Sequence, residues 1–168
     1  MLRARTNLDR DGVRLAAVSC RHGKGRGRET ECTDAHAVVF VRRGCFVRSV
    51  DGHEDLLDPT AAYCMNPGEE QRYDHPHADG DDCTWLSLDA ALVASLWGDD
   101  PTLPSGSLAS SPCIDLEQRM LLAAARRGGD PHELVERAIA VADGANEDHA
   151  VAVIAVVVDR FDLVRDAL

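Results

Sequence analysis

The stretch HAVVFVRRGCFVRSVDGHEDLLDPTAAYCMNPGEEQRYDHPHADGDDCTWLSL, residues 36–88, decides the fold. It consists of short apolar or alternating runs separated by Gly, Pro and Asp, a pattern typical of strands and turns. Asp51-Gly52, between two of these runs, is a type I′ hairpin signal. With one run further upstream, the expected strands are Arg14–Cys20, His36–Val41, Cys45–Val50, Glu54–Leu57, Ala61–Asn66, Gln71–His75 and Cys83–Leu88. No helical period interrupts them, so the sequence predicts an antiparallel sandwich or barrel rather than a parallel α/β sheet.

After residue 88 the chain becomes helical in pattern, with a Pro- and Ser-rich loop or linker over residues 101–112. A capping residue marks where each expected helix begins, and a glycine marks where a helix ends. The expected helices begin after Asp89, Asp115 and Asp130, and the second and third end at Gly128-Gly129 and Gly144.

The last segment, residues 147–168, is the most apolar part of the chain. Its β-branched residues also suit a strand, but the helical pattern continues for three turns beyond them, which favours a helix. The residues on its heptad a and d positions are Val151, Ile154, Val158, Phe161 and Leu168. So wide an apolar stripe needs a partner, which is either a second copy in a homodimer or the protein's own barrel.

These motifs, in this order, resemble the N-terminal part of an AraC-type transcription regulator. The stretches that carry the resemblance are VFVRRGCF (39–46), LLDPTAAY (56–63), NPGEEQRYDHP (66–76), GDDCT (80–84), LLAAARRGGDPHELVERAIAVAD (121–143) and VVVDRFDLVRDAL (156–168). The resemblance implies an α+β fold: an antiparallel cupin-like β-barrel (jelly roll) that binds a small-molecule effector, followed by a C-terminal helical segment that dimerises. The expected division is a sensor barrel with linker over residues 1–112 and dimerising helices over residues 113–168.

The resemblance also implies two helix-turn-helix modules further on, which this chain does not contain. Its net charge of −11 agrees with that, because an acidic surface repels the phosphates of DNA and of anionic membranes. We therefore expect DNA binding only through a C-terminal domain absent from this chain, either because the chain is truncated or because it is a naturally short protein. No apolar run opens the chain or reaches membrane-spanning length, so a cytoplasmic protein is expected.

Motifs of common enzyme classes are missing, and no catalytic residue is assigned. The sequence has no nucleophile elbow, no P-loop and no dinucleotide-binding glycine pattern. Glu69-Glu70 and the acidic residues of 79–82 fall in turns, so we expect them to be solvated rather than a paired-carboxylate site. The sequence thus favours a non-enzymatic sensor.

Aromatic residues are few, at 4% of the chain, and five of them fall on the expected strands. Phe46, Tyr63, Tyr73 and Trp85 are the candidates for lining the effector pocket inside the barrel. A pocket-lining residue and a core residue look the same in sequence, so both roles remain open for each of them.

Cysteine and histidine are dense in the barrel half, and together they are the ligands that zinc prefers. The candidate zinc ligands are Cys20, Cys32, His36, His75, His77 and Cys83. His75 and Cys83 are the leading pair because a single turn separates them, and Gln71, Tyr73 and His75 share one face of their strand. The alternative is that the cysteines are ordinary core residues and the histidines lie on the surface.

The usual metal set of cupin enzymes is mostly missing. By the resemblance, Thr30 and Cys32 fall near its paired histidines, His36 or Ala37 near its glutamate, and Gln71 near its last histidine. The alternative function is that of a small metal-dependent cupin enzyme, and the missing metal ligands argue against it.

Overall fold

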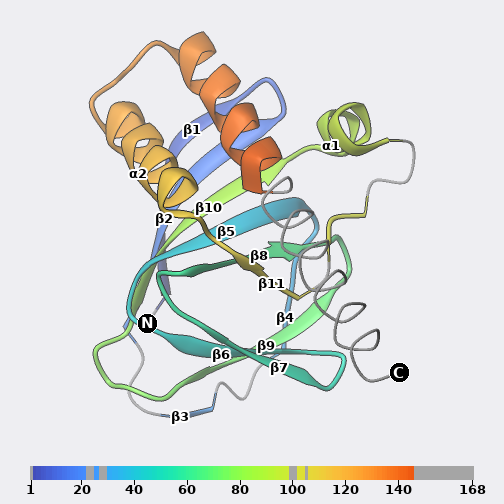
Figure 1. Cartoon of the computed structure of the whole chain (residues 1–168), viewed down its shortest axis with the longest axis vertical. Helices are drawn as coiled ribbons and strands as arrows, with labels where there is room; N and C mark the ends of the chain where they lie inside the picture. The colour runs from blue at the N-terminus through green and yellow to red at the C-terminus, as the bar shows by residue number, and fades with distance from the viewer. Residues whose placement is uncertain (1, 22–24, 27–29, 99–101, 105, 146–168) are drawn as a thin grey trace, which may run out of the picture.

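The computed structural model describes residues 2–21, 25–26, 30–98, 102–104 and 106–145. Two antiparallel sheets face each other as a barrel, and helices cover the outer side of the larger sheet (Figure 1). The six-stranded sheet runs in the order β1 (Leu2–Arg10), β2 (Val13–Cys20), β10 (Asp81–Leu88), β5 (His36–Arg43), β8 (Ala61–Met65) and β11 (Ser107–Ala109). The five-stranded sheet runs in the order β3 (Gly25–Arg26), β9 (Glu70–His75), β6 (Phe46–Val50) and β7 (His53–Leu57), and β4 (Glu31–Cys32) also pairs with β9.

All the strands expected from the sequence are present, with bounds within two residues of the prediction. The connection from β6 to β7 is the predicted tight hairpin, in which Asp51 and Gly52 have positive φ angles of 48° and 83°. From β5 to β10 the chain crosses from one sheet to the other at every connection except the β6–β7 hairpin, which is a jelly-roll arrangement. The predicted fold class, a cupin-like antiparallel barrel followed by helices, is confirmed.

Two strands of the six-stranded sheet were not predicted. β1 is an edge strand with mostly exposed, polar residues, so it shows no apolar alternation. It joins β2 through Asp11-Gly12, whose φ angles of 51° and 79° repeat the hairpin geometry of Asp51-Gly52. β11, inside the predicted loop, pairs with the free edge of β8.

Asp89 caps α1 (Ala90–Trp97) as predicted, because its carboxylate accepts a hydrogen bond from the Leu92 N–H at 2.8 Å. The predicted start of the next helix was wrong. α2 (Pro112–Arg126) begins earlier, with Ser111 as its N-cap and Pro112 in its first turn. Asp115 lies inside the first turn, where it accepts hydrogen bonds from the side chains of Gln118 and Arg119.

Residues 131–145 are helical, and Asp130 caps this helix as predicted by accepting from the N–H groups of His132 and Glu133. The predicted end at Gly144 was wrong, since the helix continues through it. A Cβ at Gly144 would lie 2.6 Å from Ile114 Cδ1, so the glycine allows α2 to approach closely. The expected helix over 147–168, with its dimer residues Val151, Ile154, Val158, Phe161 and Leu168, lies outside the described residues.

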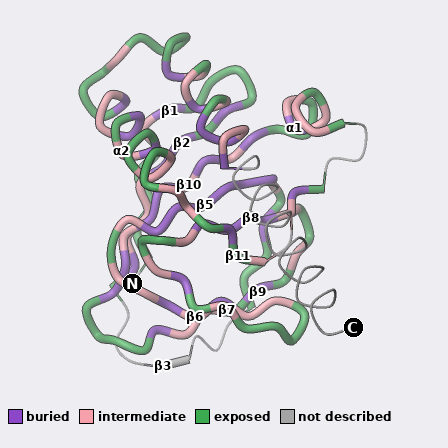
Figure 2. The backbone as a smooth tube through the Cα atoms, viewed as in Figure 1, coloured by how far each residue is buried: buried purple, intermediate pink, exposed green. Residues whose placement is uncertain are grey.

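Both faces of the six-stranded sheet are buried, as the purple central strands of Figure 2 show. One face packs on α1, α2 and the helix over residues 131–145, in one continuous apolar core. The other face, with the inner side of the five-stranded sheet, encloses a separate core in the barrel interior. The helical segment therefore packs on the sheet itself.

Candidate functional site

The barrel interior is where strand alternation gathers chemically distinct side chains. On β5, Val39 and Val41 point into the interior, whereas Val38 and Phe40 point toward the helices. Neighbouring strands follow the same alternation, so the interior is lined by a set of residues that the helices do not touch. The buried members of its apolar part are Ala37, Val39, Val41, Phe46, Leu57, Tyr63, Met65 and Cys83, with Val18, Ala61, Tyr73 and Trp85 packed against them.

All four aromatic residues assigned to the interior from the sequence lie there. Phe46 is in the middle, with its ring centroid 6.1 Å from Tyr63 and 5.7 Å from Tyr73, both edge-on. Trp85 packs against the same cluster from β10. Edge-to-face contacts of this kind hold each ring in one orientation. Their role in binding an effector stays a prediction.

A buried polar network adjoins the aromatic cluster, and the sequence reasoning missed its centre, Arg48. This side chain is 1% exposed and forms a salt bridge to Glu69 at 2.6 Å. Its Nε donates to Gln71 Oε1 at 2.7 Å, and its Nη2 donates to the carbonyl of Cys64 at 3.0 Å. The guanidinium also lies over the Tyr63 ring, 4.7 Å from its centroid. Glu69 was expected to be solvated, and that expectation was wrong because Arg48 binds it inside the barrel.

The spacing from Phe46 to Arg48 was the signal for this network, since residues two apart on a strand share a face. The same rule correctly predicted that Gln71, Tyr73 and His75 lie on one face of β9. The Tyr73 hydroxyl donates to Gln71 Oε1 at 2.8 Å and lies 3.3 Å from the Tyr63 hydroxyl.

Burial keeps both phenols of this network protonated. It raises the pKa of Tyr63 well above its usual value, and it raises the pKa of Tyr73 to about 12. At neutral pH both hydroxyls therefore remain neutral and able to donate hydrogen bonds.

Two donors that face the interior have no hydrogen-bond partner among the described residues. They are Gln71 Nε2, on a side chain that is fully buried, and Trp85 Nε1. A buried N–H without an acceptor costs about 1–3 kcal/mol, so such groups are uncommon unless something else satisfies them. The aromatic cluster thus has two donors beside it that can receive an acceptor atom.

A second group of chemically active side chains lies at the end of the barrel where β2 and β9 end and β10 begins. Cys20, His75 and Asp81 offer ligand atoms that all lie within 4.8 Å of one another. His75 Nε2 is 2.9 Å from Asp81 Oδ2, and the Cys83 thiol donates to Asp81 Oδ1 at 3.6 Å. Burial raises the pKa of the Asp81 carboxyl, although His75 partly opposes it; burial and Asp81 raise the pKa of Cys83.

The structure brings three of the six candidate zinc ligands to this end: Cys20, His75 and Cys83. Cys32 is exposed on β4 opposite Glu70, at the other end of β9 from His75. His36 is buried at the start of β5, opposite Leu88 and so at the far end of β10 from Cys83. His77 is exposed in the turn after β9.

The sequence reasoning missed Asp81, which was expected to be solvated with the other acidic residues of its turn. The residue is 4% exposed, because it pairs with Cys20 as the first residue of β10. Its neighbour Asp82 keeps a more polar setting, where it accepts from Ser19 and Arg21. All six cysteines of the sequence lie in the described part of the chain, and none of them is in a disulfide.

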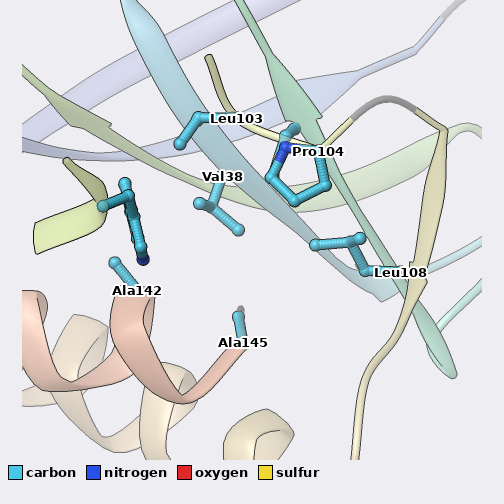
Figure 3. Close-up of a pocket in the computed structure, with 8 residues that line it drawn as sticks. Val38, Leu103, Pro104, Leu108, Ala142 and Ala145 are labelled. Carbon is cyan, nitrogen blue, oxygen red and sulfur yellow. The ribbon is translucent and has the colours of Figure 1, made fainter. Parts of the chain in front are cut away.

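A third feature lies on the other face of the six-stranded sheet. It is a small, partly open apolar hollow between this sheet and the helix over residues 131–145 (Figure 3). Its lining residues are Val38, Cys64, Trp97, Leu103, Pro104, Leu108, Ala142 and Ala145. It is separate from the barrel interior, because Val38 and Cys64 belong to the core between sheet and helices.

No family model matches this sequence, and no curated protein is significantly similar to it. Solved cupin structures resemble it at low identity. The cupin domain of an XRE-family transcriptional regulator from Enterobacter cloacae is 12% identical over 52% of this chain and 95% of that chain, with a TM-score of 0.44. A cupin 2 conserved barrel domain protein from Salinispora arenicola is 13% identical over 54% of this chain and 77% of that one, with a TM-score of 0.45.

A cupin superfamily protein from Desulfitobacterium hafniense is 11% identical over 53% of this chain and 78% of that one, with a TM-score of 0.44.

Within the part of the chain that the structure describes, no helix has the length and apolar character needed to cross a membrane.

Proposed function

We propose that this chain is the effector-sensing and dimerising part of an AraC-type transcription regulator, and that its effector binds in the barrel interior. The observation that carries the proposal is the pair of buried donors without partners, Gln71 Nε2 and Trp85 Nε1, beside an aromatic cluster. The effector expected from this lining is a small aromatic molecule that presents a carbonyl or another hydrogen-bond acceptor.

In this proposal the interior offers the effector a contact surface without a free charge. Arg48 is the buried cation there, and it is already neutralised by Glu69. The two phenols remain protonated because burial raises the pKa of each. An effector would therefore gain most from apolar contact with the rings and from the two N–H donors.

The contacts between barrel and helices offer a route by which an occupied interior would change the helices. On β10, Trp85 faces the interior, and its neighbour Thr84 faces α2, where its hydroxyl donates to Gln118 Oε1 at 2.6 Å. Beside it, Arg119 of α2 donates to the carbonyl of Arg42 at 2.9 Å. A shift of β10 around an effector would thus move α2, which is the coupling that a sensor needs.

Intrinsic fluorescence tests the effector site, because the chain has only two tryptophans, Trp85 and Trp97. A Trp97→Phe variant leaves the interior tryptophan as the reporter, and a Trp85→Phe variant leaves the one beside the outer hollow. The probes are benzamide, acetophenone and benzoate. The proposal expects saturable quenching in the Trp97→Phe protein and none in the Trp85→Phe protein.

A Gln71→Leu variant supplies the second arm, because it removes one of the two unpartnered donors while keeping similar volume. Loss of one hydrogen bond of about 1.4 kcal/mol would weaken probe binding about tenfold. Equal quenching of both single-tryptophan proteins, or no quenching by any probe, would contradict binding in the interior.

Dimerisation is tested by sedimentation of residues 1–168 and of an Ile154→Asp/Phe161→Asp variant. The proposal expects a dimer that the charged substitutions convert to monomer, because each places a charge on the predicted apolar stripe. A monomeric wild-type chain would refute the dimer, and a dimeric variant would show that the interface lies elsewhere.

In this proposal DNA is bound by other modules and not by this acidic chain. Residues 1–168 alone should give no salt-stable, sequence-selective shift of DNA in a gel. A selective complex that survives salt would contradict that part of the proposal.

The alternative of a small metal-dependent cupin enzyme gains no support from the positions that the resemblance assigns to its metal. Thr30 and Cys32 are exposed. Gln71 Oε1, where that set has its last histidine, already accepts from Arg48 and Tyr73.

A further inference from the structure

The end of the barrel formed by Cys20, His75, Asp81 and Cys83 joins the two sheets through their side chains. Cys20 ends β2, and Asp81 and Cys83 begin the neighbouring β10, all in the six-stranded sheet. His75 ends β9 and reaches across from the five-stranded sheet, with its Nε2 at 2.9 Å from Asp81 Oδ2. Two thiols, an imidazole and a carboxylate therefore converge from three strands.

We propose that these four residues bind one zinc ion, with Cys20, His75, Asp81 and Cys83 as a closed tetrahedral set. This site is distinct from the effector site proposed above and does not depend on it. Thiolate, imidazole and carboxylate are the ligand types that zinc takes, and four of them complete its tetrahedron.

Three of the four ligands lie close together, and the fourth, Cys83, adjoins them through Asp81. Zinc bonds of about 2.0 Å to N or O and about 2.3 Å to S put neighbouring ligand atoms about 3.3 to 3.8 Å apart. The Cys83 sulfur lies 3.6 Å from Asp81 Oδ1, and the atoms of Cys20, His75 and Asp81 lie within 4.8 Å of one another. Side-chain rotations would separate His75 from Asp81 and bring the sulfur atoms of both Cys20 and Cys83 toward one ion.

The surroundings favour a dehydrated, structural ion. The four residues are 4–7% exposed, so an ion among them would exchange little with water. Gly80, in the turn before β10, packs so closely that a Cβ on it would lie 2.0 Å from the carbonyl oxygen of Cys20. That contact fixes the end of β2 against the start of β10 and so fixes two ligand positions relative to each other.

The charges and protons balance in binding. Each thiol loses its proton to solvent as the sulfur bonds to zinc, so two thiolates and one carboxylate meet a dication, for a net charge of −1. Arg42 lies beside the site and donates to the carbonyl of Cys83 at 2.8 Å, which offsets part of that charge. With all four positions filled by protein, the ion would tie the sheets together rather than act on a substrate.

Metal content is measured on the wild-type chain purified under reducing conditions and dialysed against a weak chelator. Elemental analysis should find about one zinc per chain. Cobalt added to the metal-depleted protein should give the visible bands of tetrahedral Co²⁺ and a thiolate charge-transfer band. Wild-type protein without retained zinc and without tetrahedral cobalt bands would overturn the proposal.

Matched variants assign the ligands. Cys83→Ser should lose retained zinc and reduce the charge-transfer band by about half, since one of two thiolates is gone. Asp81→Asn should weaken zinc retention while keeping the full thiolate band. Cys113→Ser and Cys32→Ser change exposed cysteines elsewhere and should behave as wild type. Equal loss in these controls would place the metal elsewhere and refute this site.

Discussion

The buried pair Arg48–Glu69 makes a quantitative prediction about the barrel interior. Arg48 is 1% exposed and Glu69 14% exposed, and their atoms lie 2.6 Å apart. A Glu69→Ala change would leave the guanidinium buried without a counter-charge, which typically costs about 3–5 kcal/mol. We expect the lower end, about 3 kcal/mol, because Gln71 and the Cys64 carbonyl still accept from Arg48.

Urea unfolding followed by circular dichroism measures this change in the free energy of unfolding. For a chain of this size, about 3 kcal/mol also lowers the Tm by about 6–12 °C. The matched control is Asp9→Ala, which breaks the exposed pair with Arg14, whose side chains are 60% and 59% exposed. That control should change stability by less than about 1 kcal/mol.

An apolar double variant separates the loss of a counter-charge from simple loss of contacts. In Arg48→Met/Glu69→Leu no charge is buried, so much of the stability lost in Glu69→Ala should return. The reasoning is refuted if Glu69→Ala is no more destabilising than Asp9→Ala. It is also refuted if the double variant is less stable than Glu69→Ala.

Two further predictions concern the packing that surrounds the barrel. Thr84→Val leaves the fully buried Gln118 Oε1 without its donor, so it should lower the free energy of unfolding by about 1–3 kcal/mol. Adding Gln118→Leu removes the unpaired acceptor and should restore part of this loss. An unchanged urea midpoint in Thr84→Val would contradict the prediction. Gly80→Ala and Gly52→Ala both place Cβ on a positive-φ residue, but only the first would meet backbone, the Cys20 carbonyl at 2.0 Å. Thermal unfolding should therefore show a loss of about 1 kcal/mol for Gly52→Ala and a clearly larger loss for Gly80→Ala, and equal losses would show that the close contact has no cost.

The sequence alone determined the features that depend on neighbours along the chain. The strands of residues 36–88 were predictable because short apolar runs and two-residue alternation both reflect burial between two layers. The hairpin at Asp51-Gly52 followed from the positive φ angles that these residues tolerate. The caps at Asp89 and Asp130 followed from short-range side-chain bonds to the next turn.

Local pattern failed where an element depends on a partner far along the chain. β1 exists because its backbone pairs with β2, while its side chains stay mostly exposed and show no apolar period. The helix that begins at Pro112 was placed too late, because Asp115 and Ser111 are both acceptable caps. Pro112, at the first helical position after Ser111, is the local signal that was overlooked.

Only the tertiary structure decided which polar residues lie inside. Glu69 and Asp81 stand in sequences typical of solvated turns, yet each is held in the barrel by a partner on another strand, Arg48 and His75. The register of β2 against β10 places Cys20 opposite Asp81 and beside Cys83. Such proximity is a property of strand register and closure across the barrel, and no spacing along the chain encodes it. Composition therefore suggested the kinds of ligand, whereas the closing of two sheets determined which of them meet.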